Sequence, residues 1–229
     1  LYVIQDAMDS AEVTYQDIDA IAVTTRPGLV GSLLVGLSAA KSIAYCYQKP
    51  LIGVNHMLGH VYANVLEHPE LEFPHITLTV SGGHTLIMYI TSPTRYEILG
   101  HTVDDAVGEA YDKIAKFLGL GFPGGPVIDK MAKQGNPEAI AFPSPLIHSQ
   151  DLNFSFSGLK TYTLNTWQSE VEKGNDNEQT RANICRAFEE AVVDTLMIKC
   201  RRAVQQVNAK TLVIAGGVSA NKALRASLE

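Results

Sequence analysis

The sequence has 229 residues, of which 46% are hydrophobic and 18% are charged, as is typical of a globular protein with a sizeable core. Its net charge of −6 gives no global basic field that would attract nucleic acid. No stretch reaches the uninterrupted apolar length of a membrane span, so we expect no membrane partner.

Strand and helix patterns alternate in the first third of the chain. The pattern predicts a helix tail over 2–11, strands over 18–25 and 51–54, and helices over 31–47 and 58–66. A strand–helix–strand–helix order predicts a parallel sheet covered by helices. The polar segment 67–74 carries two prolines, and we interpret it as a crossover between two lobes.

The pattern then changes. Strands predicted over 75–80, 85–90 and 96–101 are joined by tight turns, which indicates an antiparallel meander. Further elements are predicted as helices over 104–118, 127–133 and 178–208, an irregular stretch over 136–160, and a buried strand over 211–215. The long helix has an apolar stripe formed by Ile184, Phe188, Val192, Leu196 and Cys200. We therefore predict two domains, 1–73 and 74–229.

The three cysteines are scattered and odd in number, which predicts reduced thiols in a cytosol-like compartment. Cys46 and Cys185 lie in helical patterns where a small buried hydrophobic residue fits. The chain starts with Leu1 and stops at Glu229 within a helical pattern. We therefore expect both ends to be cut.

His56 and His60 lie four residues apart, directly after a predicted strand. A helix that starts there places both imidazoles on one face, where they can bind a divalent metal. Met57 stands where a zinc protease of the His-Glu-x-x-His type has its general base, so a metalloprotease is not supported. Two incidental histidines at the start of a helix are the alternative.

Three glycine-rich turns follow predicted elements: Ser81-Gly-Gly83, Gly121–Pro126 and Gly216-Gly217. Adjacent glycines adopt positive φ and let a ligand approach the backbone, whose N–H groups then bind phosphate oxygens. Each turn alone is more often simply a tight turn. Together they predict a two-lobed α/β protein with a nucleotide in the cleft and a metal on one lip.

Six motifs occur in the order of a known family. They are Asn55-His-Met-Leu-Gly-His60, Val80-Ser-Gly-Gly-His-Thr85, Gly108-Glu-Ala-Tyr-Asp-Lys113, Phe122-Pro-Gly-Gly-Pro126, Phe154-Ser-Phe-Ser-Gly-Leu-Lys160 and Gly216-Gly-Val-Ser-Ala-Asn221. The chain resembles the TsaD family of bacterial tRNA threonylcarbamoyladenosine synthase subunits, formerly described as O-sialoglycoprotein endopeptidase (Gcp). The resemblance implies the actin-like/sugar-kinase/Hsp70-type ATPase fold, with two ribonuclease-H-like lobes, of which the first is expected to be incomplete.

The resemblance also implies a set of site residues. His56 and His60 would bind a metal, iron or zinc. The phosphate and acyl end of the nucleotide would be lined by Thr79, Val80, Ser81, Gly82 and Gly83. Its sugar or nearby groups would be bound by Asp112, Gly125 and Asp129, and Asn221 would lie near its adenosine.

The implied reaction transfers a threonylcarbamoyl group from threonylcarbamoyl-AMP to the adenosine 3′ of the tRNA anticodon. A metal would act as a Lewis acid, and the N–H groups of the Ser81–Gly83 turn would stabilise the leaving phosphate. The sequence shows no convincing general base, although His84 and Glu109 are candidates. An Asp-Thr-Ser motif at the amino end and an Asp metal ligand at the carboxyl end of the family are absent. We therefore expect this chain to be an inactive fragment.

The implied partners are tRNA, an inactive TsaB-like paralogue and a small TsaE-like ATPase, in the cytoplasm. The paralogue would pack on first-lobe helices that carry Leu33, Leu37, Val61 and Leu66. Lys199, Arg201 and Arg202 are the densest basic group, and we expect them to form a solvated face rather than a tRNA site.

The alternatives are a glycoprotein endopeptidase, a kinase or a carbamoyltransferase of the same fold, and a non-catalytic interaction module. A glycoprotein endopeptidase lacks its glutamate, and the His pair favours acyl-adenylate chemistry over a kinase. A carbamoyltransferase of the same fold stays open, and three glycine-rich turns argue against a non-catalytic module.

Because a branched side chain would strain the turn and block a ligand, Gly83→Val is expected to be among the most damaging changes.

Overall fold

The computed structural model describes residues 2–143 and 149–228. The chain forms two compact units, Leu1–Leu66 and Glu67–Glu229, which are described separately below. The first unit contains α1 (Tyr2–Ala11), β1 (Ile21–Arg26), α2 (Val30–Tyr47), β2 (Leu51–Asn55) and α3 (His56–Glu67). β1 and β2 are parallel, as predicted, with Ile21 opposite Leu51. A helix connects them because parallel strands need a crossover.

α3 begins two residues earlier than predicted, at His56. The Asn55 side-chain oxygen accepts a hydrogen bond from the Met57 N–H at 2.8 Å, which satisfies one of the first backbone donors of the helix. As a result both histidines lie within the helix.

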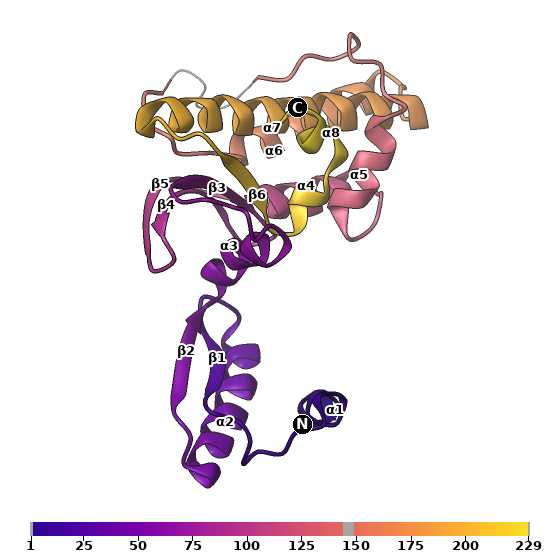
Figure 1. The fold of residues 1–229 in the computed structure, drawn as a ribbon. Helices are drawn as coiled ribbons and strands as arrows, with labels where there is room; N and C mark the ends of the chain where they lie inside the picture. Colours follow the sequence, from indigo (N-terminus) through magenta and orange to yellow (C-terminus); the bar gives the residue numbers. More distant parts are fainter. Residues whose placement is uncertain (1, 144–148, 229) are drawn as a thin grey trace. The chain divides into compact units, whose positions relative to one another are not determined.

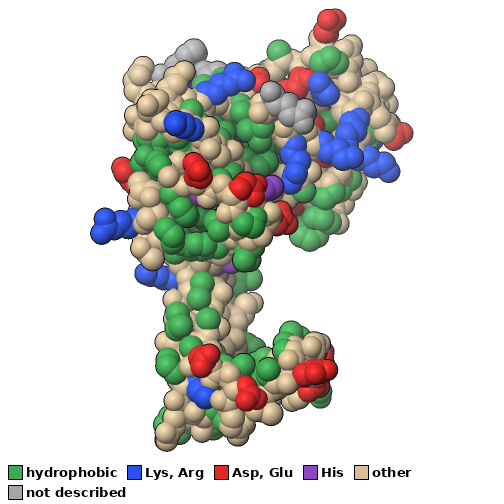
Figure 2. Space-filling view, viewed as in Figure 1, with side chains coloured by type: hydrophobic (Ala, Val, Ile, Leu, Met, Phe, Trp, Pro, Cys, Tyr) green, Lys and Arg blue, Asp and Glu red, His purple; other side chains and the backbone are tan. Residues whose placement is uncertain are grey.

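The first unit exposes many apolar side chains (Figure 2). On α2, the exposed fractions of Leu34, Val35 and Tyr45 are 56%, 75% and 86%. By length and composition α2 can cross a membrane, which corrects the expectation that no such segment exists. Small residues interrupt the apolar run of α2, so the sequence pattern alone did not indicate a helix of this kind. A single helix of this kind is weak evidence for a membrane span, since core helices of soluble proteins and signal sequences can be equally long and apolar.

The second unit is built on a four-stranded sheet with the strand order β5-β4-β3-β6. Its strands are β3 (His75–Val80), β4 (Thr85–Ser92), β5 (Arg95–His101) and β6 (Leu212–Ala215). The predicted meander is confirmed because β3–β4 and β4–β5 are antiparallel. β6 is parallel to β3, with Ile76 opposite Leu212.

Helices cover one face of this sheet (Figure 1). They are α4 (Val107–Phe117), α5 (Gly124–Ala132), α6 (Ser157–Glu172) and α7 (Glu178–Val207), followed by the 3-10 turn η1 (Gly217–Ala220) and α8 (Lys222–Ala226). The core joins Ile76, Leu78 and Val80 of β3 to aromatic side chains such as Tyr111 of α4 and Phe188 of α7. The predicted stripe of α7 is buried along its whole length.

α6 was not predicted, and its first residues fall in a stretch expected to be irregular; residues 144–148 of that stretch lie outside the described residues. Its start depends on a residue distant in sequence, because the Asp104 carboxylate accepts hydrogen bonds from the N–H groups of Phe156 and Ser157 at 2.8 and 3.3 Å. The same contact explains why α4 begins at Val107 and not at 104, since Asp104 is used as the remote cap.

Two expectations about single residues are wrong. Cys46 is exposed, whereas Cys185 and Cys200 are buried, and burial raises the pKa of both buried thiols to about 12. Lys199 is fully buried and not part of a solvated face. Its ammonium group donates to Ser149 Oγ at 2.6 Å and to the Asp151 carbonyl at 2.7 Å, which supplies the partners that a buried charge requires.

Candidate functional site

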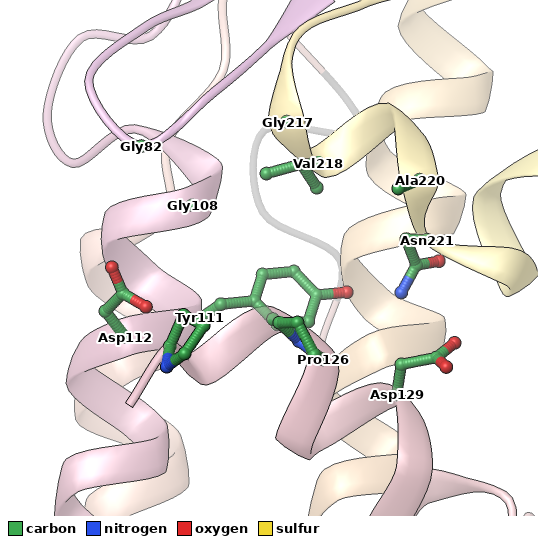
Figure 3. Close-up of a pocket in the computed structure, with 12 residues that line it drawn as sticks. Gly82, Gly108, Tyr111, Asp112, Pro126, Asp129, Gly217, Val218, Ala220 and Asn221 are labelled. Carbon is green, nitrogen blue, oxygen red and sulfur yellow. The ribbon is translucent and has the colours of Figure 1, made fainter. Parts of the chain in front are cut away.

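A pocket of about 520 Å³ opens in the second unit, between the turn after β3 and the turn after β6 (Figure 3). Its lining comes from three places: the β3–β4 turn, helices α4 and α5, and the η1–α8 turn. The lining residues are Gly82, Gly108, Tyr111, Asp112, Pro123, Gly125, Pro126, Asp129, Gly217, Val218, Ala220 and Asn221.

Five of the residues predicted for the nucleotide line this one pocket: Gly82, Asp112, Gly125, Asp129 and Asn221. Thr79 and Val80 are buried in β3, directly before the turn. Ser81 and Gly83 flank Gly82 in sequence but are not part of the lining. The structure therefore gathers residues from sequence positions 82 to 221 around one cavity.

Close backbone packing explains several glycines of this site, and at Gly216 a positive φ adds to it. A Cβ on Gly108 would lie 2.7 Å from the Ser81 carbonyl oxygen, and one on Gly124 would lie 2.4 Å from the Tyr111 carbonyl oxygen. Gly216 has a φ of +91°, and its Cβ would lie 2.3 Å from the Val80 carbonyl oxygen. These glycines bring α4, α5 and the last turn into contact with their neighbours.

The expectation for Gly83 needs correction. Neither Gly82 nor Gly83 has a positive φ, and a Cβ on either would meet nothing within 4 Å. A Cβ at position 83 therefore strains neither the turn nor its packing. Only the proposed approach of a ligand to the backbone remains as a reason for damage.

Tyr111 crosses the pocket, and its hydroxyl points toward the side that carries Asn221 and Asp129 (Figure 3). Burial, together with the carboxylates of Glu189 and Asp129, raises the pKa of Tyr111 well above its ordinary value. The hydroxyl therefore stays protonated over the physiological range. Sequence reasoning missed this tyrosine, although it lies in one of the six motifs.

The pocket carboxylates already have protein partners. Asp112 Oδ1 accepts a hydrogen bond from the Gly124 N–H at 2.7 Å, which caps α5 and explains why this helix starts before the predicted 127. Asp129 pairs with Lys133 at 2.6 Å and accepts a longer bond, 3.4 Å, from the Lys222 N–H. Both carboxylates hold the pocket walls in place.

In the first unit, the imidazole rings of His56 and His60 lie side by side, with their centroids 4.6 Å apart. Neighbouring imidazoles on one helical face fit two positions of a metal-ligand set. Within residues 2–143 and 149–228, no cluster of three or more His, Cys, Asp or Glu side chains suits a metal ion. These described residues therefore bring no third side chain of these types to the His56–His60 pair.

The model of the TsaD family, described as tRNA N6-adenosine threonylcarbamoyltransferase, matches residues 1–229. The chain belongs to the TsaD family. Membership places it broadly among transferases that modify tRNA.

Three solved structures similar to this TsaD-family chain show its fold. HypF from T. kodakarensis has a TM-score of 0.72 at 14% identity, and the match covers 99% of this chain but only 38% of HypF. Component A of (R)-2-hydroxyglutaryl-CoA dehydratase from Acidaminococcus fermentans has a TM-score of 0.55 at 16% identity, over 99% of this chain and 71% of that one. The activator of 2-hydroxyisocaproyl-CoA dehydratase from Clostridium difficile, solved with bound ADPNP, has a TM-score of 0.52 at 10% identity, over 99% and 69%. The fold is that of actin-like and sugar-kinase-type ATPases, as expected.

Two motifs of this TsaD-family chain meet at Asp105, which accepts hydrogen bonds from Lys113 and Lys160 at 2.8 Å each. Burial alone would raise the pKa of Asp105, but these two bonds outweigh it and lower that pKa. Glu109 pairs with Lys113 at 2.8 Å, so this candidate base is an ion-pair partner in the structure. Sequence reasoning missed Asp105 because it lies outside both motifs.

Changing Asp112 should separate its structural role from a ligand role. Asp112→Asn keeps an oxygen for the Gly124 N–H but removes the charge, whereas Asp112→Ala removes both. We expect Asp112→Ala to lose about 1–2 kcal/mol of stability and Asp112→Asn to lose less than half of that. Thermal unfolding gives the stability, and AMP titration gives the affinity. Equal destabilisation by both variants would contradict the capping role.

Proposed function

We propose that the pocket binds threonylcarbamoyl-AMP and that the protein transfers its threonylcarbamoyl group to the adenosine 3′ of the tRNA anticodon. The observation that carries the proposal is the convergence of Gly82, Asp112, Gly125, Asp129 and Asn221 on one cavity in a TsaD-family chain. The volume, about 520 Å³, lies in the range of small-molecule sites and suits an adenylate.

In this proposal each part of the pocket lining binds a different part of the ligand. The phosphate and the acyl end are bound by the backbone at Gly82, together with Ser81 and Gly83 beside it. Thr79 and Val80, in the strand before this turn, belong to the same part of the site. Backbone N–H groups there stabilise the charge that develops on the leaving AMP. Asp112, Gly125 and Asp129 bind the ribose region, and Asn221 lies near the base. The ADPNP bound to the C. difficile activator supports a nucleotide as the class of ligand for this fold.

We further propose that His56 and His60 hold one divalent metal, iron or zinc, together with a ligand from outside the described residues. When bound, such an ion supplies Lewis-acid polarisation of a carbonyl group. The adjacent rings support this assignment. The residues of the pocket keep their proposed roles whatever the identity of the metal.

We propose that the protein works in the cytoplasm with tRNA, an inactive TsaB-like paralogue and a small TsaE-like ATPase. The net charge of −6 does not attract a tRNA backbone, and Lys199, one of the three residues in the densest basic group of the sequence, is buried. The exposed apolar side chains of α2 offer surface for the paralogue. We expect weak tRNA binding by the isolated full-length protein and tighter binding with the partners.

The test incubates the full-length protein with unmodified tRNA and threonylcarbamoyl-AMP, with and without the partners, and measures the modified nucleoside by mass spectrometry. Product is expected only in the complete mixture. Absence of product there would overturn the proposed reaction. Tight, salt-sensitive tRNA binding and full transfer by the lone protein would refute only the dependence on partners. A purified glycoprotein, expected to stay uncut, tests the endopeptidase alternative.

A further inference from the structure

Glu189 is a buried carboxyl group on α7, behind the pocket wall. It is 4% exposed, and it does not line the pocket. Among the described residues it forms no ion pair, unlike its neighbour Glu190, which pairs with Arg186. Its Oε1 accepts a hydrogen bond from the Asn221 side-chain nitrogen at 2.6 Å. A buried carboxyl group that accepts a hydrogen bond from a pocket residue calls for an explanation.

The other end of the Asn221 amide is also held. Its oxygen accepts a hydrogen bond from the Leu224 N–H at 2.8 Å and thereby caps α8. A backbone N–H can only donate, so the amide oxygen must face Leu224 and the nitrogen must face Glu189. The two contacts together fix which atom of the amide lies where.

An amide nitrogen carries two N–H groups, and Glu189 takes one of them. Figure 3 shows the Asn221 nitrogen on the inner side, toward Tyr111 and Asp129, with the oxygen turned away. One N–H group therefore remains for the cavity that Asn221 lines.

We infer that Glu189 is a positioning residue, which orients Asn221 so that the pocket presents a hydrogen-bond donor to an acceptor atom of the bound nucleotide. The inference rests on the nucleotide site proposed above and deepens it. A ring nitrogen of adenine or a ribose oxygen is an acceptor of this kind, whereas an amino group at the same place would meet a second donor.

The test compares three changes in the full-length protein. Glu189→Leu removes the acceptor at similar volume. Glu189→Gln keeps an oxygen for Asn221 and removes only the charge. Glu190→Leu is the matched control, one residue along α7, on a side chain that is 39% exposed. Each variant is titrated with AMP, with its 1-, 3- and 7-deaza forms, and with 2′- and 3′-deoxy-AMP.

In the wild type, we expect one analogue to bind roughly tenfold more weakly than AMP, because it lacks the acceptor that Asn221 meets. This penalty should fall to within about twofold in Glu189→Leu and persist in Glu189→Gln and Glu190→Leu. A merely structural role would weaken AMP and all analogues alike and leave the penalty unchanged.

Three outcomes overturn the inference: a full penalty in Glu189→Leu, loss of the penalty in Glu190→Leu, or a wild type that binds AMP and every analogue equally. If Glu189→Leu does not fold, Glu189→Met replaces it. This change also removes the acceptor of the Asn221 side-chain nitrogen, so the same penalty must disappear. A wild type that binds no AMP at all would instead overturn the proposed nucleotide site.

Discussion

Gly216→Ala is expected to destabilise the protein by about 3 kcal/mol, more than any other single methyl group at the pocket. The residue has a φ of +91°, which is unfavourable for alanine, and the new Cβ would lie 2.3 Å from the Val80 carbonyl oxygen. Neither backbone can move independently, because β3 and β6 are paired up to Ala215. In a domain of this size, the melting temperature should fall by about 6–12 °C.

Gly217→Ala is the matched control. This glycine follows directly in sequence and lines the pocket, yet a Cβ on it would meet nothing within 4 Å. Its substitution should change the stability by less than about 0.5 kcal/mol. Chemical unfolding of both variants measures the difference in their free energies of unfolding. Similar stabilities of the two variants would show that the contact with Val80 does not constrain the turn.

His56→Ala and His60→Ala should each abolish stoichiometric metal binding by the full-length protein. Each change removes one of two adjacent imidazoles, and a divalent ion held by fewer ligands exchanges readily with solvent. We expect the metal content to fall at least tenfold, as measured by mass spectrometry after dialysis. His68→Ala is the control, since His68 is an exposed residue that pairs with Glu70. Retention of metal by both variants would show that His56 and His60 are not metal ligands.

The order and type of most elements could be predicted from the sequence, because their signals are local. The strand at 75–80 and the stripe of α7 are examples. α6 could not be predicted, since its first turn is capped by Asp104, a residue far away in the chain. The burial of Lys199 was missed for a similar reason: its partners Ser149 and Asp151 come close only in the folded unit.

The candidate site, too, could be predicted only in part from the sequence. Glycine-rich turns and the family motifs identified five residues that line the pocket. The sequence did not reveal that Gly108 and Gly216 are needed for backbone packing, whereas Gly83 is not. Nor did it reveal Glu189, which acts through Asn221 and carries no motif of its own. Contacts between elements decide these roles, and a single sequence records no such contacts.

The position of β3 in the sheet has a consequence for synthesis of the chain. β3 is flanked by β4, which follows at once, and by β6, which is the last strand of the described residues. While the ribosome adds the helices between them, one edge of β3 stays without its partner and can pair with other chains. The turn at Gly216–Asn221, which supplies four of the twelve lining residues of the pocket, follows β6 directly in the chain. The proposed nucleotide pocket is therefore complete only once translation has passed Asn221, and until β6 has paired the open edge of β3 is exposed to pairing with other chains.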